Sequence, residues 1–221
     1  NFSAVACHFG LHLRRALNVP VGLINASWGG AALRAFLPDE VIQDDPIVRE
    51  ACAPYRDSQR AAILRPALLF NGMIHPVIPF GLRGAIWYQG EADADAGDLY
   101  RHAFPKLIQC WRQRWGQGDF SFLFVQLPGL DQARADTWPD LREAQRQTLE
   151  LPNTGMAVAI DIGEADNVHP RNKKEVGRRL ALWALGTAYE RDIVYSGPLC
   201  RSMTVEGGAI VFKRREDYER A

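Results

Sequence analysis

Apolar positions along the chain follow two periods, one typical of helices and one typical of strands. In residues 2–17 the apolar side chains recur at spacings of three and four, which predicts a helix with one buried stripe. Short apolar runs between such segments predict strands. We expect helices at 2–17, 98–115, 138–149 and 172–189, and strands at 19–25, 84–88, 120–127 and 155–160. This alternation predicts a parallel sheet covered by helices on both faces.

The remaining segments carry weaker patterns. Residues 37–64 are polar, helix-leaning and poorly periodic, so we expect an excursion over the surface and no core element. Asn172 can cap the last predicted helix, and Glu175 three residues later completes a capping-box-like pair. We expect the domain to occupy residues 1–200, with 201–221 as the start of a C-terminal β segment or a frayed end.

Composition and charge narrow the class of protein. The 221 residues are 47% hydrophobic and 24% charged, which is typical of one globular domain. Because 26 basic residues balance 26 acidic ones, we expect neither nucleic acid nor a membrane surface as partner. No apolar run approaches the roughly 20 residues that span a bilayer. The four cysteines stand far apart, so we predict buried thiols and no metal site, and one disulfide stays open.

Three predicted strands end in loops that are rich in polar residues and glycine. These loops are residues 25–30, 89–91 and 161–169. In open parallel sheets the ligand site lies beyond the carboxyl ends of the strands. We therefore expect any chemistry where the three loops meet.

The third loop places Asp166 three residues before His169. At this spacing a turn can bring the carboxylate onto one ring nitrogen and leave the other free, which is the arrangement of a general base and its orienting partner. Such an imidazole can accept a proton from a hydroxyl nucleophile and return it to the leaving alcohol. The alternative is a structural hydrogen-bonding pair.

The other two loops offer hydrogen-bond donors. In Ser27-Trp28-Gly29-Gly30 the paired glycines allow backbone N–H groups to approach a ligand, or they form a tight turn. Gln89 can donate its amide to the same oxyanion, or it can cap its loop.

Several neighbouring side chains also have two possible roles. Arg142 and Gln145 lie one helical turn apart and can reach a sugar hydroxyl or carboxylate, or tie their helix to the sheet. Trp28 and the aromatic pair at 87–88 can stack on a sugar face or belong to the core. The acidic residues at 91, 93 and 95 lack the ligand pattern of a calcium loop, so we expect them to cap the loop.

Together the three loops resemble the sialate O-acetylesterase group within the SGNH, or GDSL-like, hydrolases. Further segments at 71–76, 124–127, 141–145 and 172–181 fit the same group, so the resemblance spans nearly the whole chain. The blocks that carry it are Asn25-Ala26-Ser27-Trp28-Gly29-Gly30, Trp87-Tyr88-Gln89-Gly90-Glu91-Ala92 and Asp166-Asn167-Val168-His169-Pro170.

This resemblance implies a three-layer α/β/α, flavodoxin-like fold with a mainly parallel sheet. It implies hydrolysis of acetyl esters on carbohydrates through an acyl-enzyme, without a metal or other cofactor. By the same resemblance His169 is the general base with Asp166 as partner, and Gly29 and Gln89 form the oxyanion hole. The compartment implied is secreted, periplasmic or lysosomal in type, and the oligomeric state stays open.

One departure from the family pattern concerns the nucleophile. The family carries its serine in a Gly-Gln-Ser-Asn-like block, which this sequence does not contain. We expect that block, with the first strand, upstream of residue 1, and Ser27 is a minor alternative. Three functions stay open: a sialate O-acetylesterase, an acetylesterase for xylan or another glycan, and an inactive, truncated carbohydrate-binding relic.

Overall fold

The computed structural model describes residues 2–56, 62–131 and 136–214, and its elements follow the predicted alternation. The helices are α1 Ala4–Leu17, α2 Asp39–Asp44, α3 Pro46–Cys52, α4 Gly97–Trp115, α5 Trp138–Gln147 and α6 Lys173–Trp183, and the strands are β1 Gly84–Trp87, β2 Ser121–Val125, β3 Thr154–Ala157, β4 Cys200–Glu206 and β5 Ala209–Arg214. Short 3₁₀ and π turns connect several of them, including a π-helical turn at Phe70–Ile74 and another at Ala184–Ala188 that continues α6.

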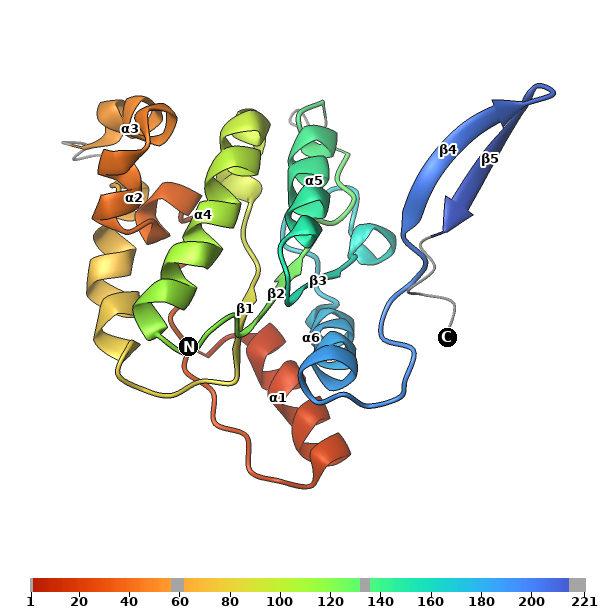
Figure 1. Ribbon diagram of the computed structural model, residues 1–221, viewed down its shortest axis with the longest axis horizontal. Helices are drawn as coiled ribbons and strands as arrows, with labels where there is room; N and C mark the ends of the chain where they lie inside the picture. Colours follow the sequence, from red (N-terminus) through yellow and green to blue (C-terminus); the bar gives the residue numbers. More distant parts are fainter. Residues whose placement is uncertain (1, 57–61, 132–135, 215–221) are drawn as a thin grey trace.

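Strands β1, β2 and β3 form a parallel sheet with β2 in the centre. Leu123 lies opposite Ile86 on one side and Gly155 on the other. Helices α4 and α5 pack together on one face, whereas α1 and α6 pack together on the other (Figure 1). The predicted class, an α/β domain with a parallel sheet between helical layers, is confirmed.

The central strand shows why the sheet needs cover on both faces. Phe122 and Phe124 belong to the hydrophobic cluster under α4 and α5, whereas Leu123 and Val125 belong to the cluster under α1 and α6. All four are at most 2% exposed. Burial of each contributes about 1.5–3 kcal/mol, so a strand with no polar alternation is stable only between two helical layers.

Helix α1 begins and ends where local chemistry predicts. The Ser3 side chain accepts a hydrogen bond from the Ala6 amide at 3.2 Å, and Asn18 closes the helix in the left-handed conformation. The helix lies very close to α6, because a Cβ added at Gly177 would lie 2.7 Å from the Cβ of His8. A glycine at this position allows the two backbones to approach.

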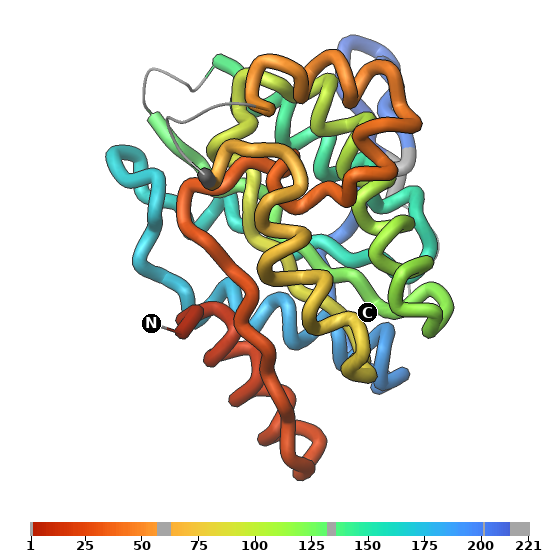
Figure 2. Tube along the Cα trace, turned by 90° about the vertical axis from the view of Figure 1, so that its left-hand side faces the viewer, coloured from red at the N-terminus to blue at the C-terminus, as the bar shows by residue number. Residues whose placement is uncertain are grey.

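The predicted strand at 19–25 is not formed. These residues have no strand assignment, and within the described residues the parallel sheet contains only β1, β2 and β3. The chain runs here as an extended segment back along α1 (Figure 2). An apolar, extended run becomes a strand only where a neighbouring strand pairs with its backbone groups.

The predicted surface excursion at 37–64 is also wrong in part. Helices α2 and α3 occupy this segment, and each contributes to the core. Leu37, Ile42, Val48 and Cys52 are each at most 1% exposed and belong to the larger hydrophobic cluster. The two helices are too short to show a clear helical period, so the sequence pattern did not indicate which of their residues are buried.

Strands β4 and β5 form an antiparallel hairpin beside the domain (Figure 1). Its exposed apolar side chains, two from each strand, are Met203, Val205, Ile210 and Phe212. The hairpin occupies the described part of the C-terminal segment up to residue 214, and residues 215–221 lie outside the described part. The boundary between domain and β segment stays a prediction.

The remaining predictions concern the cysteine thiols, membrane-spanning helices and metal ligands. All four cysteines are free thiols, with Cys52 and Cys110 buried and Cys7 and Cys200 exposed, so the expectation of buried thiols holds for two. No helix among the described residues is long and apolar enough to cross a membrane. In the same part of the chain, no group of three His, Cys, Asp or Glu side chains is arranged to hold a metal ion.

Candidate active site

The loop after β1, residues 88–93, is called the glutamine loop here. Gln89 is 8% exposed, and its Nε2 donates to the carbonyl of Ala31 at 3.0 Å and to Asp93 Oδ2 at 2.5 Å. Gly90 follows with φ 150°, and a Cβ there would lie 2.8 Å from Leu141 Cδ2. Only glycine combines this backbone conformation with such close packing.

Asp93 joins the glutamine loop to the segment at 25–33, called the glycine loop. Its Oδ2 accepts the Leu33 amide at 2.7 Å as well as the Gln89 amide, and Arg34 Nη1 lies 3.8 Å from Oδ1. Burial raises the pKa of Asp93, while the hydrogen bonds from Leu33 and Gln89 and the Arg34 charge oppose that rise. The two loops are therefore tied by a buried carboxylate that is 5% exposed.

Within the glycine loop, Gly29 faces open space. It is exposed, and apart from its own chain neighbours no heavy atom of the described residues lies within 4 Å of the place a Cβ would occupy. The side chain of Trp28 beside it is 57% exposed, and Ser27 Oγ donates to Asn25 Oδ1 at 2.8 Å. A ligand can approach the backbone of this loop from solvent.

Residues 163–171, between β3 and α6, are called the histidine loop. The Asn167 amide donates to the carbonyl of Glu164 at 3.1 Å, which closes a tight turn with Asp166 inside it. Asn167 Oδ1 then accepts the His169 amide at 2.9 Å. Both predicted catalytic residues, Asp166 and His169, are exposed on this one loop.

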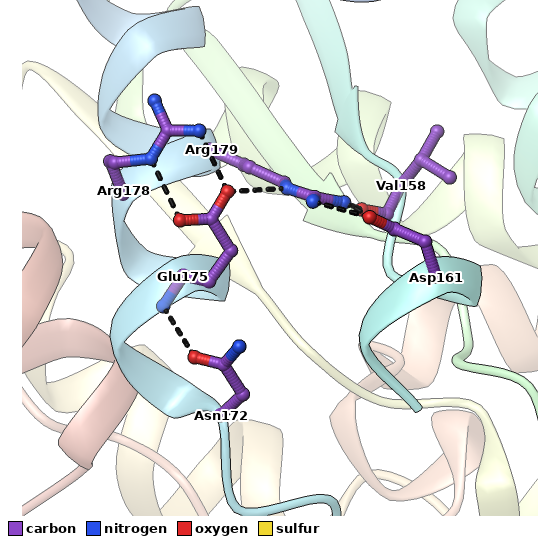
Figure 3. A network of polar contacts seen from close by, with 6 residues as sticks. All are labelled: Val158, Asp161, Asn172, Glu175, Arg178 and Arg179. Carbon is purple, nitrogen blue, oxygen red and sulfur yellow. Dashed lines mark hydrogen bonds and ion pairs between the residues drawn. The ribbon is translucent and has the colours of Figure 1, made fainter. Parts of the chain in front are cut away.

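The histidine loop is anchored by a polar network at the start of α6 (Figure 3). Asn172 Oδ1 accepts the Glu175 amide at 3.2 Å, as predicted for the helix cap. The Glu175 carboxylate, however, bonds Arg178 and Arg179 instead of completing a capping box. Arg179 also binds Asp161 with two bonds of 2.6 Å, so α6 is fixed to the turn that precedes the loop.

The glutamine loop lies near the start of α6, where the histidine loop ends. Burial raises the pKa of Glu91, and the charges of His169 and Lys173 act on the same carboxyl to lower it. Lys173 Nζ lies 5.0 Å from the centre of the Tyr88 ring, and burial lowers the pKa of this lysine. Since Gln89 is bonded to the glycine loop, the glutamine loop contacts the glycine loop on one side and approaches the start of α6, after the histidine loop, on the other.

The structure corrects the predicted role of Gln145. This side chain is 0% exposed and holds the strand ends: Nε2 donates to the carbonyls of Gln89 and Val125, both at 3.2 Å, and Oε1 accepts the Leu127 amide at 2.9 Å. It therefore ties α5 to the sheet and has no surface to offer a substrate. Arg142 is half-buried on the same helix, and its carbonyl accepts Gln126 Nε2 at 3.2 Å.

The expected donor role of Gln89 also needs revision. Both hydrogen bonds from its Nε2 go to protein acceptors, and the buried Oε1 has no partner among the described residues. An amide in this orientation presents an acceptor, whereas an oxyanion requires a donor. Gln89 can donate to a ligand only after it gives up one of these two bonds.

Two acidic residues have more specific positions than the sequence indicated. Asp93 and Glu91 were expected merely to cap the loop. Instead, Asp93 joins two loops, and the charges of His169 and Lys173 act on the Glu91 carboxyl. The available signal was an acidic residue beside a predicted buried strand end, where a carboxylate must find partners.

Comparisons with known proteins agree with this arrangement. Residues 4–185 match the family model "Carbohydrate esterase, sialic acid-specific acetylesterase". Sialate O-acetylesterases from Homo sapiens and Mus musculus are 35% and 36% identical over 89% of this chain, and the matches cover 41% and 45% of those proteins. The crystal structure of a carbohydrate acetylesterase from Xanthomonas citri superposes with a TM-score of 0.85 at 38% identity, over 97% of this chain and 48% of that one.

The chain thus spans somewhat less than half the length of these relatives. The family match covers most of the chain, including all three loops. This chain belongs to the sialic acid-specific acetylesterase family of carbohydrate esterases.

Proposed function

We propose that this chain provides the general-base histidine and the oxyanion-hole donors of a serine esterase that removes O-acetyl groups from sialic acid or related carbohydrates. The observation that carries the proposal is the arrangement of the strand-end loops: Gln89 bonds the glycine loop, and Lys173, just after the histidine loop, lies over the Tyr88 ring of the glutamine loop. The names of the related proteins support acetylated carbohydrate as substrate.

In the proposed mechanism His169 acts first as general base. It takes the proton of a serine hydroxyl as that oxygen attacks the acetyl carbonyl, and it then gives the proton to the departing sugar hydroxyl. The acetyl-serine is hydrolysed by a water that His169 deprotonates in turn. Asp166 would stabilise the imidazolium that forms in each half-reaction. The serine itself stays unassigned.

Negative charge on the carbonyl oxygen would be held by the glycine loop. We assign the first donor to the backbone N–H of Gly29, because this glycine lies in open space. Gln89 takes second place, as a donor available after exchange of one of its bonds. Trp28, exposed beside Gly29, and Arg142 are proposed to contact the sugar.

The test is acetate release from O-acetylated sialic acid by the full-length protein and its variants. His169→Ala should lower kcat/KM by roughly 10²–10⁴-fold, and Asp166→Asn should lower it less. His12→Ala on α1 is the matched control and should leave kcat/KM unchanged. Full activity of the His169→Ala variant would remove the imidazole from the mechanism.

The Xanthomonas citri neighbour, described as a carbohydrate acetylesterase, favours a broader second candidate. The same assay with acetylated xylan oligosaccharides distinguishes the two substrates by their kcat/KM ratio. Binding of acetylated sugar without any acetate release would instead indicate a carbohydrate-binding relic.

A further inference from the structure

One carboxylate, that of Glu164, bonds both limbs of the histidine loop. Its Oε1 accepts the Arg171 amide at 2.7 Å and Arg171 Nε at 3.2 Å. Its Oε2 accepts Asn167 Nδ2 at 3.0 Å. A single side chain thus connects the first residues of the loop with its turn and with its last residue before α6.

The same contacts extend to the backbone of His169. Asn167, held by Glu164 through both its side chain and its backbone amide, uses its Oδ1 to fix the His169 amide at 2.9 Å. Asp166 lies within the turn that the Glu164 and Asn167 backbones close. The positions of both catalytic candidates therefore depend on one side chain that belongs to neither.

We propose that Glu164 is a positioning residue for the esterase reaction, one that sets the places of His169 and Asp166 by closing the histidine loop. The proposal rests on the proposed function. Glu164 does not act on the reacting atoms, so its effect is confined to geometry. A displacement of about 1 Å in a catalytic group can cost roughly 10²-fold in rate, which makes such a contact significant.

The Glu164 carboxylate keeps its negative charge over the pH range in which a histidine can act as base. The hydrogen bond from the Arg171 amide, together with those from Asn167 and the Arg171 side chain, lowers the pKa of Glu164 to about 2. The carboxylate is therefore ionised at any pH where a histidine can act as base, and it does not itself titrate with the reaction. The pH dependence of kcat should thus keep its shape when Glu164 is replaced, while its height falls.

The alternative is an ordinary surface ion pair, which contributes little beyond a small amount of stability. The two interpretations of Glu164, a surface ion pair and a positioning residue, predict changes in different measured quantities. A structural pair alters thermal stability and leaves kcat alone, whereas a positioning residue alters kcat and leaves KM and the unfolding midpoint nearly unchanged. Glu40 provides the matched control, since it binds Arg114 Nε at 2.6 Å and Cys110 Sγ at 3.2 Å and joins α2 to α4.

The experiment measures kcat, KM and thermal midpoint for full-length wild type and for Glu164→Ala, Glu164→Gln, Glu40→Ala and His169→Ala. We expect Glu164→Ala to lower kcat by about 10–100-fold with KM within about twofold. Glu164→Gln keeps one acceptor oxygen, so it should recover part of kcat. Glu40→Ala should leave kcat unchanged.

Each result decides the proposal. Wild-type kcat in Glu164→Ala, with activity abolished in His169→Ala, overturns the role of Glu164 and leaves the proposed function standing. Wild-type activity in His169→Ala removes both. If Glu164→Ala fails to fold, Glu164→Gln decides: a lowered kcat at an unchanged midpoint supports positioning, and an unchanged kcat refutes it.

Discussion

Replacement of Asp93 by alanine tests whether a buried carboxylate holds the glycine and glutamine loops together. The substitution leaves the Leu33 amide, now bonded at 2.7 Å, without an acceptor. It also removes the charge 3.8 Å from Arg34, whose side chain is 11% exposed. Gln89 keeps its bond to Ala31 and loses the one to Asp93.

The expected loss follows from these contacts. An unsatisfied buried N–H costs about 1–3 kcal/mol, and removal of one partner from a buried ion pair costs about 3–5 kcal/mol. Because the Arg34 side chain keeps its bond to the Leu64 carbonyl at 2.9 Å, we expect the total to lie near the sum of the two lower figures, about 4 kcal/mol. Asp93→Asn keeps one acceptor for the Leu33 amide, so it should cost about 1–2 kcal/mol.

The assay is urea denaturation followed by circular dichroism and tryptophan fluorescence, with the free energy of unfolding extrapolated to water. Asp98→Ala is the matched control, because this aspartate is 96% exposed in the first turn of α4 and, among the described residues, forms an ion pair with Arg101 alone. It should lose no more than about 1 kcal/mol. A loss of that size for Asp93→Ala would refute the inference that the carboxylate links the loops.

Three further changes probe packing and charge. Gly177→Ala should lower the urea midpoint by an amount equivalent to about 1–3 kcal/mol, because the new Cβ forces α1 away from α6. Gly90→Ala should cost about 1–3 kcal/mol through strain at φ 150°, whereas Gly22→Ala, with open space around the new Cβ, should cost almost nothing. The hydrogen bond from Arg178 lowers the pKa of Glu175 from 4.5 to about 2, so its contribution to stability is complete above pH 4.5 and disappears as the pH falls toward 2. The difference in thermal midpoint between wild type and Glu175→Gln should therefore shrink over that range, and a constant difference would contradict the assignment.

Helical and strand periods predicted the layers of this fold but not all their members. The segments with a sustained period became α1, α4, α5 and α6, and each of the three strands of the parallel sheet was expected. The strand expected at 19–25 failed because pairing depends on a neighbour, and a local pattern carries no information about that neighbour. The segment of α2 and α3 was expected to lean helical, but its place in the core was missed because fewer than three turns show no reliable period.

The candidate site shows the same division between local and distant information. Loops at strand ends, and the residues they carry, follow from element order alone. The bonds that shape those loops do not, since Glu164 reaches Arg171 seven residues away and Asp93 reaches Leu33 sixty residues away. Whether a polar side chain meets solvent or a buried backbone group is decided by such contacts, which no sequence period records.

The fully buried amide of Gln145 has a consequence for how the domain can vary. This one side chain supplies hydrogen-bond partners to backbone groups at the ends of β1 and β2 that would otherwise lack them. Any substitute must offer a donor and an acceptor at once in a cavity shaped for a carboxamide. The backbone groups of two strands therefore restrict which residues can replace Gln145. Even an isosteric glutamate would place an extra lone pair against a carbonyl oxygen.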